Sequence, residues 1–238
     1  MNLLLLDYEA RVSEIEVYFA FLADVVAKGA KLHYPRARKT KQAAISEDLV
    51  KILKANALLI LYNLVESSIR NGLNEIYDSV KADKVQYEVL RQELRELWVH
   101  DEFKPDPMRL PENNAKRVIE MLELVISSKR ILFDSKLLPI SGNLDAERVR
   151  ELSAKYGFSH QTTRSTKGGY HLTRVRQERN NLAHGLKSFK ECGRDLTLDA
   201  LIEIKRQVVL YIRQILKNIQ RFVDRRQYCV RGQRARTA

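Results

Sequence analysis

Apolar residues recur every three or four positions over long stretches of this chain, and this spacing constrains its fold more than any other feature. It is typical of helices that bury one face. In the first stretch, residues 3–28, the apolar positions are Leu4, Tyr8, Val12, Ile15, Phe19, Leu22 and Val26. The same spacing runs from Ser46, a good N-cap, to about Val80, and again over residues 199–226. Only nine glycines and five prolines interrupt 238 residues. The sequence therefore predicts an all-α fold built on long helices.

Shorter helices are expected between the long ones, over residues 85–99, 113–127, 145–156 and 170–184. Residues 104–111 contain three prolines and cannot be helix interior, so we expect a long irregular loop there. Loops are also expected over 28–41 and 159–169, and a turn over 187–197. Residues 129–138 fit either a short strand or a continued helix. Neither side of the proline-rich loop has an obvious core of its own. We therefore predict one domain over 1–238, with a basic tail at 227–238 that we expect to be disordered.

The charge of the chain favours a polyanionic partner. The formal net charge is +12 and the pI about 9.7, which suits nucleic acid or an anionic membrane surface. Residues 28–41 carry six basic side chains and no acid, and residues 217–238 carry seven basic side chains and one acid. Within these segments we single out Arg36, Arg38, Lys39, Lys41, Arg225 and Arg226 as RNA-contacting candidates. A solvated linker is the alternative explanation for the first segment.

The cysteines and the apolar runs argue against secretion and against a membrane span. Cys192 and Cys229 are too few for a disulfide framework and lack the spacing of a metal site. The apolar start of the chain ends at once at Asp7 and Glu9, and no stretch reaches the roughly 18 apolar residues of a transmembrane helix. We expect a cytoplasmic protein that needs no metal and no cofactor.

The segment Arg179-Asn180-Asn181-Leu182-Ala183-His184-Gly185 carries the chemistry of this chain. It lies at the predicted end of the helix over 170–184, where Gly185 is the expected left-handed stop. Arginine grips phosphate with a planar, permanently charged fork, and histidine moves protons near pH 7. On a helix Arg176, Asn180 and His184 share one face, whereas Arg179 lies well round from His184. A common phosphate could still reach both, because His184 lies at the fraying end.

Cleavage of RNA through its own 2′-hydroxyl fits these side chains. The reaction needs a base, an acid and positive charge on the phosphoryl oxygens, and no metal in its first step. His184 would move protons, Arg179 would hold the phosphate and Asn180 would orient either group. A helix-capping role for His184 is the simpler alternative.

Other side chains are candidates for support. Glu66 and Arg70 fit an ordinary helix salt bridge, although a buried Glu66 could orient Arg179 or His184. Tyr170 and His171, at the start of the motif helix, could stack on a base, but we favour core packing for both.

The run from Arg174 to Gly185 resembles the signature of the HEPN superfamily. Residues 61–70 resemble the earlier helix of bacterial stand-alone HEPN nucleases, and Phe189 and residues 195–201 fit the same pattern. The resemblance covers roughly residues 45–225. It implies an antiparallel helical bundle with additional helices and a metal-independent endoribonuclease of the toxin or phage-defence type. It also implies a homodimer, a cognate antitoxin protein as partner, and Arg179, Asn180 and His184 as the site.

Two alternatives to a nuclease remain open at this point. One is a non-catalytic HEPN module that binds RNA or a partner protein. The other is a DNA-binding protein built on the helix over 145–156, which we rank low because no clear second recognition helix follows.

Overall fold

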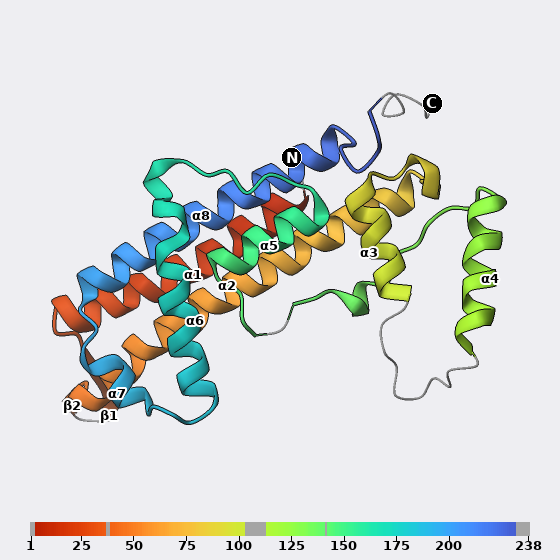
Figure 1. Cartoon of the computed structure of the whole chain (residues 1–238). Coiled ribbons are helices and arrows are strands. Elements are labelled where there is room, and N and C mark those ends of the chain that lie inside the picture. The colour runs from red at the N-terminus through yellow and green to blue at the C-terminus, as the bar shows by residue number, and fades with distance from the viewer. Residues whose placement is uncertain (1–2, 37–38, 103–112, 141, 232–238) are drawn as a thin grey trace. The chain divides into compact units, whose positions relative to one another are not determined.

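The structure is a computed structural model that describes residues 3–36, 39–102, 113–140 and 142–231 (Figure 1). In these residues it contains eight α-helices, one two-stranded hairpin and three short 3-10 helices. The fold is all-α, as the apolar spacing predicted. Within the described residues, no helix is both long and apolar enough to cross a lipid bilayer.

The chain divides into two compact units, each formed by several separate segments. Unit 1 comprises residues 1–69, 140–147 and 162–214, and unit 2 comprises residues 70–139, 148–161 and 215–238. Helices α2 (Glu47–Ala82) and α8 (Leu198–Asp224) each contribute one part to each unit. The prediction of one domain over 1–238 stays a prediction.

Unit 1 is built on α1 (Leu3–Ala27), the first part of α2 and the first part of α8. Helices α1 and α8 run antiparallel, because Glu9 pairs with Arg213 whereas Glu16, further along α1, pairs with Lys205. Their apolar faces form the core, and the buried Tyr8 donates a hydrogen bond of 2.6 Å to the Val209 carbonyl. Gly29 follows α1 with a φ of +61° and ends it as the sequence predicted.

A hairpin occupies the segment that we expected to be a loop. Strands β1 (Lys31–Arg36) and β2 (Lys39–Ala44) pair antiparallel, with Lys31 opposite Ala44 and Arg36 opposite Lys39. The loop prediction for residues 28–41 is therefore wrong. It relied on a run of like charge around Pro35, but both strands of a two-stranded hairpin are edge strands, which tolerate proline and commonly carry charged residues.

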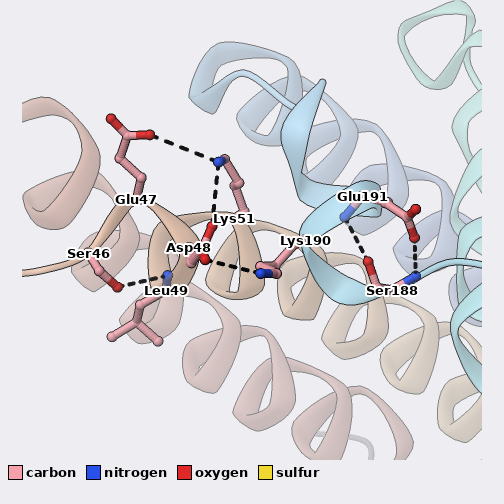
Figure 2. A network of polar contacts seen from close by, with 8 residues as sticks. All are labelled: Ser46, Glu47, Asp48, Leu49, Lys51, Ser188, Lys190 and Glu191. Atoms are coloured by element: carbon pink, nitrogen blue, oxygen red, sulfur yellow. Dashed lines mark hydrogen bonds and ion pairs between the residues drawn. The ribbon is translucent and has the colours of Figure 1, made fainter.

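A second unexpected element, α7 (Phe189–Arg194), connects α6 (Tyr170–Ala183) to α8 and is anchored on the start of α2 (Figure 2). Ser188 caps it in a capping box with Glu191, in which each side chain accepts a backbone N–H. Lys190 bonds Asp48 at 3.1 Å, and Ser46 accepts the Leu49 N–H at the start of α2 as the N-cap prediction required.

Close backbone packing, more than charge, holds α7 in place. Lys190 and Asp48 are both about half exposed, and exposed ion pairs contribute only about 0.2–1 kcal/mol. Gly193, by contrast, is buried so closely against α2 that a methyl group there would lie 1.9 Å from the Lys51 carbonyl oxygen. The turn that carries His184 is thereby fixed at both of its ends, by α6 and by α7.

Unit 2 packs the second part of α2 against the end of α8, with Gly72 facing Leu216 and Ile219. The remaining helices of this unit are α3 (Gln92–Glu102), α4 (Asn113–Ile126) and most of α5 (Ala146–Tyr156). Tyr77 of α2 stacks on Phe133 at 4.6 Å between ring centroids, and its hydroxyl lies 2.9 Å from that of Tyr156.

Several predicted boundaries shift in the structure. The helix expected over 85–99 is η1 (Tyr87–Val89) followed by α3. Residues 129–138 form neither a strand nor a continued helix but an irregular segment with η2 (Ser135–Leu137), and the loop 159–169 ends in η3 (Arg164–Gly169).

The first residues of the predicted tail, 227–230, are not disordered: Tyr228 and Cys229 are buried, and the Val230 N–H donates to the Val89 carbonyl. The rest of the predicted tail, from residue 232, lies outside the described residues, as does the loop 104–111.

Substitution of Gly193 tests how α7 is anchored. We expect Gly193→Ala to lower the free energy of unfolding by roughly 1–3 kcal/mol, since overpacking against a backbone carbonyl cannot be relieved by a rotamer change. Denaturant unfolding followed by circular dichroism measures the loss. Gly72→Ala is the matched control: it also adds a methyl group to a helical glycine, but there the nearest atoms are the ends of the flexible Ile219 and Leu216 side chains. Equal losses in the two variants would contradict the anchoring.

Candidate functional site

Helix α6 (Tyr170–Ala183) carries the predicted motif and ends as the sequence indicated. His184 is its C-cap, and Gly185 follows with a φ of +68°. The Gly185 N–H bonds the Leu182 carbonyl and the Leu186 N–H bonds the Asn181 carbonyl at 2.8 Å. This pair of bonds is a Schellman motif, which requires a left-handed residue at position 185. Leu172, Val175 and Leu182 bury the other side of α6.

The Arg179 guanidinium is held by three neutral neighbours. Its Nη1 donates to the Asn180 side-chain oxygen at 3.1 Å. Its central carbon lies 5.0 Å from the centroid of the Tyr62 ring, in cation–π geometry. Gly142 lies so close that a methyl group there would be 2.9 Å from Nη1. Among the described residues, no carboxylate forms an ion pair with Arg179.

The loop over residues 142–145 is clamped onto α6 and α2. Asn143 accepts a hydrogen bond of 2.9 Å from the Asn180 amide. One turn earlier on α6, Arg176 pairs with the buried Asp145 at 3.3 Å. The Leu144 N–H donates to the Tyr62 hydroxyl at 3.2 Å. These three contacts fix Gly142 beside Arg179.

Tyr62 is 3% exposed, and the face of its ring packs against the Arg179 guanidinium. Burial raises the pKa of its phenol; the Leu144 N–H lowers that pKa in part, and the negative charge of Glu66 raises it further. The ring therefore stays a neutral phenol at physiological pH, and its face is available to the guanidinium. Glu66, one turn further along α2, is half-buried and reaches the site through Tyr62.

His184 lies at the exposed end of α6 and is not sealed in the core. Its N–H continues the helix to the Asn180 carbonyl at 3.0 Å. Its imidazole has no hydrogen-bonding or ion-pair partner among the residues that the structure describes. The structure thus joins Arg179 to Asn180 directly and leaves His184 on the same helix end with its ring open to solvent.

The remaining predicted residues belong to other elements or to unit 2. Arg70 is one turn after Glu66 but belongs to unit 2. Arg225 is exposed, whereas Arg226 pairs with Asp83 at 2.7 Å and is therefore engaged within unit 2. Arg36, Lys39 and Lys41 belong to the strands of the hairpin, and Arg38 lies outside the described residues.

Core packing was the wrong prediction for Tyr170. Its side chain is 73% exposed at the start of α6, and its ring contacts His171 edge-on at 5.3 Å between centroids. The reason is local: Gly168 and Gly169 adopt left-handed conformations directly before it, so α6 begins with Tyr170 turned away from the core.

Tyr62, Gly142, Asn143 and Asp145 were missed as site residues. The signal for the last three was the short turn-forming sequence Gly142-Asn143-Leu144-Asp145 before a helix, which was present but not used. Among the described residues, no group of three or more histidine, cysteine, aspartate or glutamate side chains is arranged to hold a metal ion.

Comparison with known proteins identifies the family. The model of the MAE_28990-like HEPN family matches residues 2–228, nearly the whole chain. No curated protein and no solved structure matches it. HEPN proteins include ribonucleases and nucleotide-binding modules. The similarity to HEPN proteins is therefore not limited to Arg174–Gly185, and the chain belongs to the HEPN superfamily, in its MAE_28990-like family.

Proposed function

We propose that this protein is a metal-independent endoribonuclease that cleaves RNA by attack of the 2′-hydroxyl on the adjacent phosphate. One observation supports this above all. Arg179 is fixed by Tyr62, Asn180 and Gly142, without a carboxylate partner in the part of the chain that the structure describes, at the helix end that also exposes His184. A positioned guanidinium that pairs with no described carboxylate, at the same helix end as an accessible imidazole, suits a phosphodiester better than a neutral ligand.

The proposed reaction gives each side chain one role. The 2′-oxygen forms a bond to phosphorus as its proton leaves to a base, and the bond from phosphorus to the 5′-oxygen breaks as that oxygen takes a proton from an acid. His184 serves as the acid or the base. Arg179 binds the non-bridging oxygens, whose charge grows in the transition state, and Asn180 orients the guanidinium. The products are a 2′,3′-cyclic phosphate and a 5′-hydroxyl.

A homodimer would supply the second proton-transfer group. One chain offers one His184, and the reaction uses both an acid and a base. The HEPN relationship supports pairing of two motifs, with one histidine from each copy. Arg176 and Glu66 act as supporting residues in this scheme, through Asp145 and Tyr62 respectively.

Basic segments would draw the RNA toward the site. The net charge of +12 and the basic strands of the hairpin support this role, and the attraction should weaken as salt rises. The exposed ring of Tyr170 offers a surface on which an unpaired base can stack. Its distance from His184, 14 residues along the helix at about 1.5 Å each, spans several nucleotides.

The physiological role that we propose is that of a toxin or phage-defence effector, held inactive by a cognate antitoxin protein. The alternative is a non-catalytic HEPN module that binds RNA or a partner protein. One observation favours this alternative: within the described residues, nothing orients the His184 imidazole.

Cleavage assays separate the two functions. We expect purified protein to cut single-stranded RNA in the presence of EDTA. We also expect Arg179→Ala and His184→Ala each to reduce the rate by roughly 100-fold or more, because each removes a transition-state contact. Gel analysis of the fragments and their cyclic-phosphate ends measures this. Arg174→Ala on the same helix and His100→Ala are controls that should retain activity. RNA binding without cleavage in the wild type would establish the alternative.

Gly142 offers a test of how Arg179 is positioned. We expect Gly142→Ala to reduce cleavage by roughly 10- to 100-fold, because the added methyl group displaces the guanidinium. Gly168→Ala is the matched control: that glycine also has a positive φ, +60°, but has open space around it. Both variants should lose similar stability in thermal unfolding, and only Gly142→Ala should lose activity. Similar rates for the two variants would rule out this positioning role.

Expression in a bacterial host tests the toxin role. The wild type should arrest growth and His184→Ala should not, with both proteins produced at equal levels on immunoblots. Arrest by both variants would argue against RNA cleavage as the cause, and growth with both would argue against a toxin.

A further inference from the structure

Helix α4 in unit 2 exposes an apolar strip that plays no part in the proposed reaction. Ile119, Leu122 and Ile126 are 56%, 54% and 81% exposed. No residue from Ala115 to Ile126 is buried. Exposed apolar strips of this kind mark interaction surfaces.

The strip has the spacing of a seam between two helices. Ala115, Ile119, Leu122 and Ile126 follow one another at intervals of four, three and four residues. This alternation is the repeat that keeps one face of a helix against a neighbouring helix. The occupant that the strip fits best is therefore another helix.

One edge of the strip borders an apolar groove of about 240 Å³, lined by Trp98 and Val99 of α3 and by Val118, Met121 and Val125 of α4. The opposite edge carries two exposed charges, Lys116 and Glu123. They lie seven residues apart, so they project from the same side of α4.

The order of these two charges selects the direction of the partner helix. In an antiparallel pair of α4 helices, Ile119 faces the second copy's Leu122, and Ala115 faces the second copy's Ile126. In this register Lys116 comes beside the second copy's Glu123, and Glu123 beside the second copy's Lys116. A parallel pair would instead place this charged edge against the second copy's Val118 and Val125, so that neither charge would find a partner.

We propose that α4 is a self-association surface, through which two copies of this chain pair antiparallel about a two-fold axis. Such an isologous contact forms every interaction twice, so a helix of 14 residues makes two ion pairs and, along the strip, four apolar contacts. On the other edge Val118 meets the second copy's Val125, which joins the two apolar grooves. This surface is separate from α6, and the proposal does not depend on the proposed nuclease activity.

Sedimentation velocity on the full-length protein over a range of concentrations tests the pairing. We expect Leu122→Glu to weaken one association step by about 100-fold, since it places a charge in the centre of the seam in both copies. Glu120→Lys is the control, because it is an exposed site on α4 away from the strip and should leave the step unchanged. Circular dichroism should be unchanged in both variants, because both sites are exposed.

Charge reversal tests the register. Lys116→Glu and Glu123→Lys should each weaken the association about tenfold, and the double variant should restore it. A mixture of the two single variants should form the mixed pair in preference to either like pair. A wild type that stays monomeric at its highest soluble concentration would overturn the proposal. So would an association that Leu122→Glu leaves intact, or a double variant that remains weak.

Discussion

The candidate site depends on one physical arrangement, the fixing of the loop over residues 142–145 against α6. Asn143 and Asp145 reach Asn180 and Arg176, which are one turn apart on the helix. Leu144 is tied to the buried Tyr62 of α2. Without these contacts Gly142 would not pack against Arg179, and the guanidinium would sample many rotamers, as long surface side chains do.

Much of the fold could be predicted from the sequence, because helices that bury one face leave a periodic trace. The spans of α1, α2, α4, α6 and α8 agree with the predicted ranges to within about two residues. The hairpin left only a weak trace, since β1 alternates apolar residues at Leu32 and Tyr34 alone and β2 has no such alternation. Helix α7 was missed for another reason: it has only six residues and contains Gly193. Its capping box of Ser188 and Glu191 was a readable signal that the prediction did not use.

The site was predictable only in part. Arg179, Asn180 and His184 lie within one turn and a half of helix, so their spacing carried the information. The contacts that hold Arg179 join residues far apart in the chain. Asn143 and Asn180 are separated by 37 positions, and Tyr62 and Leu144 by 82. No periodic pattern encodes such pairings, and only the folded chain brings them together.

Among the described residues Arg179 has no carboxylate in an ion pair, and this has a consequence for binding. Most other half-buried arginines described in unit 1 form an ion pair with a carboxylate, as Arg176 does with Asp145 and Arg213 with Glu9. A ligand that approached those would have to displace a resident counter-ion. At Arg179 the side chain has already lost its conformational entropy during folding. Its guanidinium carries a positive charge that no carboxylate of the described residues pairs with. A phosphate that binds there meets a preorganised cation and displaces no carboxylate of the described residues.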